Sequence, residues 1–98
     1  MSERQERALA AFLDGYLHQD FVSEHGTAEA AAREYARVAT TAERHAAHAA
    51  LEAFIEKGEK ETRQEWLRRL HLLGGAWRPR SLAALRSVAR VLAEPDRL

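Results

Sequence analysis

The stretch ALAAFLDGYL, residues 8–17, decides the fold class. Its large apolar residues recur every three or four positions, the repeat of one helix face; they are Leu9, Phe12, Leu13, Tyr16 and Leu17. We therefore predict a helix over residues 3–19. Gly15 lies inside this helix and costs about 1 kcal/mol relative to Ala. We expect another backbone or a ligand to approach closely at Gly15 and offset that cost.

Two more helices are predicted downstream, after a connection at residues 20–26. Thr27 is a suitable N-cap for an alanine-rich, narrow helix that runs to Val38. Thr40 precedes a Glu by three positions, which is the spacing of a capping box, so another helix begins there. This helix runs to Lys57, where the following Gly58 suits a left-handed C-cap. Because neither Pro nor Gly separates the two helices, one long bent helix remains the alternative.

The C-terminal third predicts two further helices. Thr62 repeats the capping-box spacing, and its helix ends at the pair Gly74-Gly75. A loop over residues 76–80 leads to Ser81, the N-cap of a last helix that Pro95 follows. We therefore predict an all-α fold, a single compact bundle of about five helices joined by short loops.

Composition agrees with one globular domain spanning residues 1–98. The chain is 46% hydrophobic and 31% charged, and it contains no Cys, which excludes disulfides and thiolate chemistry. No apolar run is long enough to span a membrane, and the charged N-terminus lacks the pattern of a signal peptide. We expect a cytoplasmic protein that is a monomer or a homodimer.

Charge is balanced overall but unevenly placed. The formal net charge is zero, so no field of the whole molecule favours nucleic acid or a membrane surface. Residues 1–30 nevertheless hold six acids against two bases, a balance of −4, and the remaining residues therefore carry +4. We expect this asymmetry to matter for the choice of partner.

Metal chemistry has weak support in the sequence. His45 and His48 share a helix face, with Glu52 one turn further on, but a zinc site needs at least three well-placed protein ligands and no His-Glu-x-x-His motif is present. Four N-terminal acids fit no calcium-binding loop; they are Asp14, Asp20, Glu24 and Glu29. We expect no metal and no cofactor.

Catalysis is equally weakly supported. His18 and Asp20 form an acid–histidine pair close in sequence, with His25 nearby and Ser23 as the nearest nucleophile. Nothing in the pattern positions Ser23, and no Gly-x-Ser-x-Gly turn occurs. We expect His18 and Asp20 to terminate a helix by satisfying backbone groups, and the chain not to be an enzyme.

Arginines in the C-terminal half support the alternative of a small nucleic-acid-binding or regulatory module, including a helix-turn-helix. They are Arg63, Arg68, Arg69, Arg78, Arg80, Arg86 and Arg90, interleaved with Trp66 and Trp77. Trp66 falls on an apolar stripe, which favours a core position, and the zero net charge disfavours a strong phosphate-binding surface.

Residues 12–21, FLDGYLHQDF, resemble the GGYFHQDW segment near the start of a family of small helical bacterial immunity proteins from contact-dependent growth inhibition systems. Matching positions are Gly15, Tyr16, His18, Gln19 and Asp20, whereas Asp14, Leu17 and Phe21 differ. The likeness is looser over residues 8–92, where Leu73-Gly74, Trp77 and Pro79 echo the ending of the family.

The resemblance implies a protein that binds and neutralises a cognate toxin. If such a toxin is basic, an acidic surface would steer association. We accordingly expect the contacts to come from Asp14, Gln19, Asp20, Phe21, Glu24 and Glu29. We expect Gly15, Tyr16 and His18 to be structural and to hold the first corner of the fold, a role that Asp20 could share.

Overall fold

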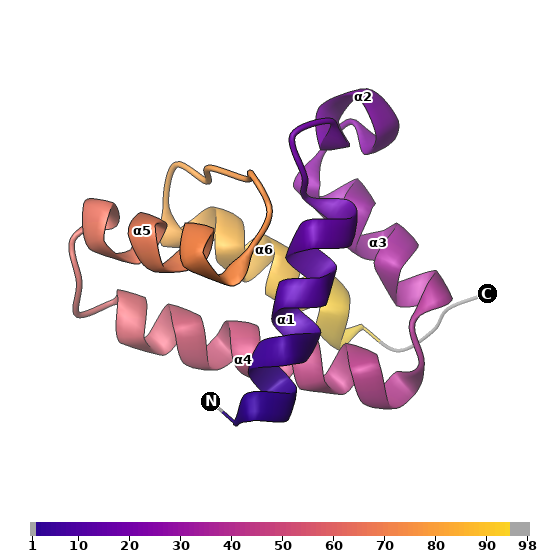
Figure 1. Cartoon of the computed structure of the whole chain (residues 1–98), viewed down its shortest axis with the longest axis horizontal. Helices are drawn as coiled ribbons and strands as arrows, with labels where there is room; N and C mark the ends of the chain where they lie inside the picture. The colour runs from indigo at the N-terminus through magenta and orange to yellow at the C-terminus, as the bar shows by residue number, and fades with distance from the viewer. Residues whose placement is uncertain (1, 95–98) are drawn as a thin grey trace.

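Helices are the regular elements of residues 2–94, the part of the chain that the computed structural model describes. Their bounds are α1 Glu3–Tyr16, α2 Phe21–His25, α3 Ala28–Val38, α4 Thr41–Gly58, α5 Arg63–Leu73 and α6 Leu82–Ala93 (Figure 1). The all-α prediction is confirmed: five of these helices are long, and α2 is a single short turn. The predicted Pro95 after the last helix lies outside the described residues.

Local capping explains where most of the helices begin. Thr40 and Thr62 each form the predicted capping box, and the Thr27 hydroxyl accepts the backbone N–H of Ala30. Ser2 forms a third capping box with Gln5, at the start of α1. Each box satisfies two backbone donors that a helix start would otherwise leave unpaired.

Ser81 precedes α6 as predicted, but no hydrogen bond from its side chain caps the helix. The break between α3 and α4 is clear. Ala39 has φ −71° and ψ 151°, an extended conformation that ends α3, so the alternative of one bent helix is wrong.

The end of α1 differs from the prediction. The helix stops at Tyr16, three residues before the predicted end, because Leu17 leaves helical geometry with φ −120° and ψ 35°. The carbonyl oxygen of Leu17 instead accepts the backbone N–H of Ala76, at 2.8 Å. The predicted connection over residues 20–26 contains α2, which five residues of low apolar content did not reveal.

Gly58 has a role other than the predicted left-handed cap. It is the last residue of α4 and has no positive φ, and Glu59 follows with φ −63° and ψ −20°. A Cβ at Gly58 would lie 3.0 Å from Cδ2 of Leu82 and 3.7 Å from Cβ of Trp66. A small residue is therefore needed because α5 and α6 approach closely there.

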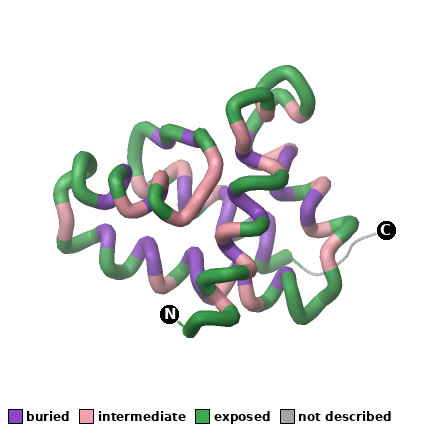
Figure 2. Tube along the Cα trace, in the orientation of Figure 1, coloured by how far each residue is buried: buried purple, intermediate pink, exposed green. Residues whose placement is uncertain are grey.

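The core is organised around α4. Helices α1 and α6 pack on it, α3 packs on α6, and α5 lies against α1 and α4 (Figure 1). Buried positions follow the inner faces of these helices (Figure 2); the largest fully buried side chains are Phe12, Phe54, Leu9, Leu13, Leu17, Leu51, Leu70, Leu85, Leu92 and Val88. The predicted stripe of residues 9–17 therefore lies in the core apart from Tyr16, which is half-buried. Val38, at the end of α3, is 65% exposed.

Arg44 is a buried charged residue within this core, only 6% exposed. Its Nη1 donates to the carbonyl oxygens of Leu92, at 2.7 Å, and of Glu94, at 3.1 Å. These carbonyls belong to the C-terminal end of α6, which has no further helical donors and carries the negative end of the helix dipole. Arg44 thus ties α4 to the end of α6.

Candidate partner-binding surface

The turn between α1 and α3, residues 18–27, projects at one end of the molecule; we call it the α2 corner (Figure 1). None of its residues is buried (Figure 2). Gln19, Asp20, Val22 and Glu24 are exposed on it, and Val22 is 62% exposed, an unusual position for an apolar side chain. Val22 was not among the predicted contacts.

His18 sets the shape of the α2 corner. Its Nδ1 accepts the backbone N–H of Asp20 at 3.1 Å, and its Nε2 lies 2.6 Å from Oε1 of Glu24. This arrangement places the ring proton on Nε2, where it faces the carboxylate. Asp20 precedes α2 without a capping hydrogen bond from its side chain. The histidine ring therefore holds the turn, whereas the Asp20 side chain does not cap α2.

Tyr16 fixes the base of the α2 corner by aromatic packing. Its ring centroid lies 5.4 Å from that of Tyr35, edge to face, 6.3 Å from Phe12 and 5.9 Å from the His25 ring. Tyr35 is buried, and its hydroxyl donates to the carbonyl oxygen of Glu43 at 3.3 Å. Burial, followed by the nearby Glu43 charge and Tyr16, raises the pKa of Tyr35 above 10.0.

Asp14 lies on the other side of α1. Its Oδ1 accepts the backbone N–H of Gly75 at 2.7 Å. Gly75 has φ 73°, and a Cβ there would lie 2.7 Å from the carbonyl oxygen of Leu13. Asp14 thus fastens the loop after α5 to α1, so the six predicted contact residues do not form one patch.

No other segment approaches Gly15 closely, so the part of the prediction that concerned another backbone is wrong. Gly15 is exposed, and an added Cβ would meet no described atom within 4 Å apart from its chain neighbours and the backbone of its own helix. The remaining predicted contacts, Phe21 and Glu29, are both half-buried. Phe21 is the first residue of α2, within the α2 corner, and packs against the core. Glu29 lies in the first turn of α3 and borders the corner.

The candidate metal and catalytic groups are not assembled into a site. His48 pairs with Glu52 at 3.3 Å, while His45 is exposed. Within residues 2–94, no three His, Asp or Glu side chains gather as metal ligands. Ser23 is exposed on α2, and the part of the chain that the structure describes gives its hydroxyl no hydrogen bond to a histidine.

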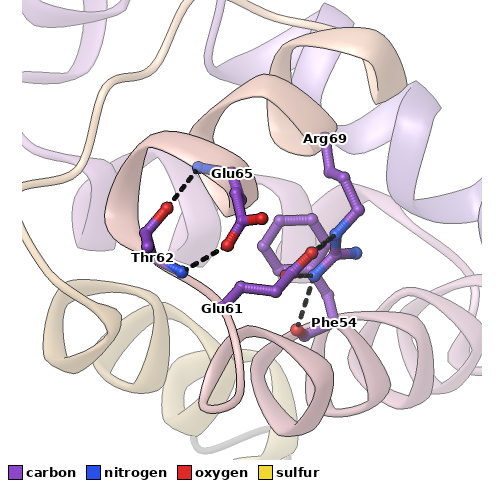
Figure 3. Close-up of polar contacts among 5 residues, drawn as sticks. All are labelled: Phe54, Glu61, Thr62, Glu65 and Arg69. Carbon is purple, nitrogen blue, oxygen red and sulfur yellow. Dashed lines mark hydrogen bonds and ion pairs between the residues drawn. The ribbon is translucent and has the colours of Figure 1, made fainter.

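Several of the C-terminal arginines have structural partners. Arg69 donates from Nε to both carboxylate oxygens of Glu61 at 3.0 Å, and its guanidinium lies 4.2 Å from the Phe54 ring centroid (Figure 3). The hydrogen bond from Arg69, with its charge, holds the pKa of Glu61 below 4.5. Arg63 donates to the carbonyl oxygens of Pro79 and Arg80.

Both tryptophans are buried, Trp66 at 3% and Trp77 at 8% exposure, which confirms the core position predicted for Trp66. Neither offers a ring face to a nucleic-acid base. In addition, α6 packs on α4 and α3, whereas α5 packs on α1 and α4. These packing partners differ from those of a helix-turn-helix, in which the second helix packs on the first.

The fold is that of a small all-helical protein, and its projecting α2 corner exposes acidic and polar side chains. A family model described as CdiI immunity protein matches residues 5–84, and the chain belongs to this family. The match confirms the resemblance seen at residues 12–21. No curated protein and no solved structure matches the chain significantly. No helix among the described residues is long and apolar enough to cross a membrane.

Proposed function

We propose that this chain binds a cognate toxin domain in the cytoplasm and neutralises it by occlusion, without catalysing a reaction. The observation that carries the proposal is membership of the CdiI immunity protein family over residues 5–84. Inhibition by occlusion needs complementary surface chemistry and no reaction centre, which suits the arrangement of side chains described above.

We further propose that the α2 corner contacts the toxin. Gln19, Asp20 and Glu24 are exposed polar and acidic residues on the same short corner as the exposed Val22. This combination is typical of protein–protein interfaces. Phe21 supports the corner from beneath.

Charge favours a basic toxin surface as the partner of the α2 corner. Residues 8–32 contain four acids, Asp14, Asp20, Glu24 and Glu29, and neither Lys nor Arg. An uninterrupted acidic segment attracts a basic partner over the screening length of about 8 Å at physiological salt and speeds association. Glu29 adds to this field from the edge of the corner, whereas the Asp14 carboxylate is bound to the backbone of Gly75.

The function is tested by co-expressing the chain with the toxin domain encoded beside its gene. We expect growth to recover and the two proteins to co-purify as a complex. Growth arrest that is undiminished by the chain, together with no measurable complex, would refute the function.

The location of the interface is tested separately with Asp20→Lys/Glu24→Lys. Its matched control is Glu56→Lys/Glu94→Lys, which changes the net charge equally at two exposed acids on α4 and at the end of α6. We expect the first variant alone to slow association by about tenfold or more at low salt. If both variants associate as fast as the unmodified chain, the α2 corner is not the interface, although the function stands.

A further inference from the structure

Leu72 is the most exposed of the large apolar side chains that the structure describes, at 82%, compared with 65% for Val38 and 62% for Val22. It lies near the end of α5, whose Trp66, Leu67 and Leu70 are buried. Core packing therefore does not explain an apolar residue at this position. A single exposed apolar side chain is common on protein surfaces, so what Leu72 can do depends on the groups around it.

Leu72 lines three recesses. The first, of about 390 Å³, is formed by α5 and the loop that follows it, and its walls include Arg68, His71 and Arg78. The second, of about 400 Å³, lies between α1, α4 and α5 beside Leu73, and the third, of about 260 Å³, lies between α1 and the end of α5. Leu72 is therefore an exposed apolar side chain at the rim of recesses that a partner's side chains could enter.

The charge around the first recess is positive. Its walls hold Arg68, Arg78, His71 and Gln64 but no carboxylate. Arg68 and Arg78 are exposed, and over residues 2–94 the structure records no ion pair for either, although it records close pairs for Arg69 and Arg86. Two guanidinium groups in the walls of a recess that has no carboxylate in its lining are complementary to carboxylates, which arginine binds with two parallel hydrogen bonds.

We propose that Arg68, His71, Leu72 and Arg78, here called the Leu72 surface, bind an acidic segment of another protein. Carboxylates of that segment pair with the two arginines, and an adjacent apolar side chain packs against Leu72. A protein fits better than a nucleic acid because the exposed apolar group is aliphatic and both tryptophans, which could stack on bases, are buried. Since this charge is opposite to that of the α2 corner, the inference goes beyond the proposed contact with the toxin.

The test uses a phage-displayed library of short random peptides, with the full chain as bait. We expect the selected peptides to carry net negative charge and at least one large apolar residue. Their affinity should fall about tenfold with Arg68→Glu/Arg78→Glu and also with Leu72→Ser. The matched control, Arg4→Glu/Arg33→Glu, reverses two exposed arginines on α1 and α3 and should leave the affinity within about twofold.

All the replaced side chains are exposed, so we expect every bait to fold, and circular dichroism checks that each one does. Selection of neutral or basic peptides, or no enrichment above the Arg68→Glu/Arg78→Glu bait, overturns the proposal. So does a single-stranded oligonucleotide that binds through the two arginines with strong salt dependence while acidic peptides do not. The test needs no toxin, so its outcome is independent of the proposed function.

Discussion

Replacing Arg44 tests how the end of α6 is held. Arg44→Met keeps an unbranched apolar stem in the buried site and removes the guanidinium that reaches the carbonyl oxygens of Leu92 and Glu94. Hydrogen bonds from a charged donor contribute about 1.5–3 kcal/mol each, and a cation at a helix C-terminus adds about 0.3–1 kcal/mol. Desolvation of the buried guanidinium offsets part of this sum.

We therefore expect Arg44→Met to lower the free energy of unfolding by about 2 kcal/mol. The two carbonyl oxygens lose a donor in the variant while the apolar contacts of the stem persist. Arg44→Ala removes those contacts as well and should lower it by about 3 kcal/mol. For a domain of this size, about 2 kcal/mol corresponds to a fall in melting temperature of about 8–16 °C.

Urea denaturation followed by helical circular dichroism measures both effects. The matched control is Arg90→Met, which replaces an exposed arginine on α6 itself and should change stability by less than about 0.5 kcal/mol. If Arg44→Met unfolds at the same urea concentration as the control, the tie between α4 and the end of α6 contributes nothing, and our reasoning about the buried guanidinium is refuted.

Three further changes test other parts of the structure. Gly75→Ala should destabilise the fold by more than about 1 kcal/mol, because Gly75 has φ 73° and an added Cβ would crowd the carbonyl oxygen of Leu13. Gly15→Ala, at a position with open space around it, should stabilise the fold by about 0.5–1 kcal/mol. Equal melting temperatures of the two variants would contradict this expected difference. Glu61 has a pKa held below 4.5 in the folded state, so its ion pair with Arg69 stabilises the fold above that pH, and this stabilisation is lost as the pH falls through the pKa of the folded state. The difference in stability between the unmodified chain and Glu61→Gln should therefore narrow on acidification. A difference that stays constant with pH would exclude the ion pair as the cause of the stability difference. Tyr35 has a raised pKa, so the unmodified chain should lose stability above about pH 10 more steeply than Tyr35→Phe, and parallel profiles would contradict the burial of the hydroxyl.

Local rules in the sequence predict most of the helix boundaries. The helix starts at Thr27, Thr40 and Thr62 depend on hydrogen bonds within four residues, so the local sequence is enough to predict them. The end of α5 at Gly74-Gly75 is equally local, because positive φ values favour glycine.

Boundaries set by distant parts of the chain were missed. The early end of α1 coincides with a hydrogen bond from Ala76 to Leu17 across 59 positions of sequence, and the role of Gly58 depends on Leu82. The buried position of Arg44 depends on the last turn of α6 in the same way. No local pattern encodes such contacts.

The candidate surface shows the same division. Acids without nearby bases were visible in the sequence and indicated the region of the α2 corner. The sequence did not show that Asp14 and Asp20 belong to different surfaces, Asp14 binding the loop after α5 and Asp20 lying on the α2 corner. Their directions depend on where α1 ends, and a distant contact accompanies that end. The exposed Leu72 was also missed. It lies two residues after the buried Leu70 and so falls on another face of α5, but a run of apolar residues at a helix end does not by itself show which of them faces outward.

The hydrogen bonds of His18 have an evolutionary consequence. One imidazole ring holds both the backbone of Asp20 and the side chain of Glu24, and the exposed side chains of Val22 and Ser23 take no part in these two contacts. Substitutions at such exposed positions typically alter stability by less than about 0.5 kcal/mol. Val22 and Ser23 can therefore change with little loss of stability. If the α2 corner contacts the toxin as proposed, the choice of partner can change through these positions while the fold stays the same.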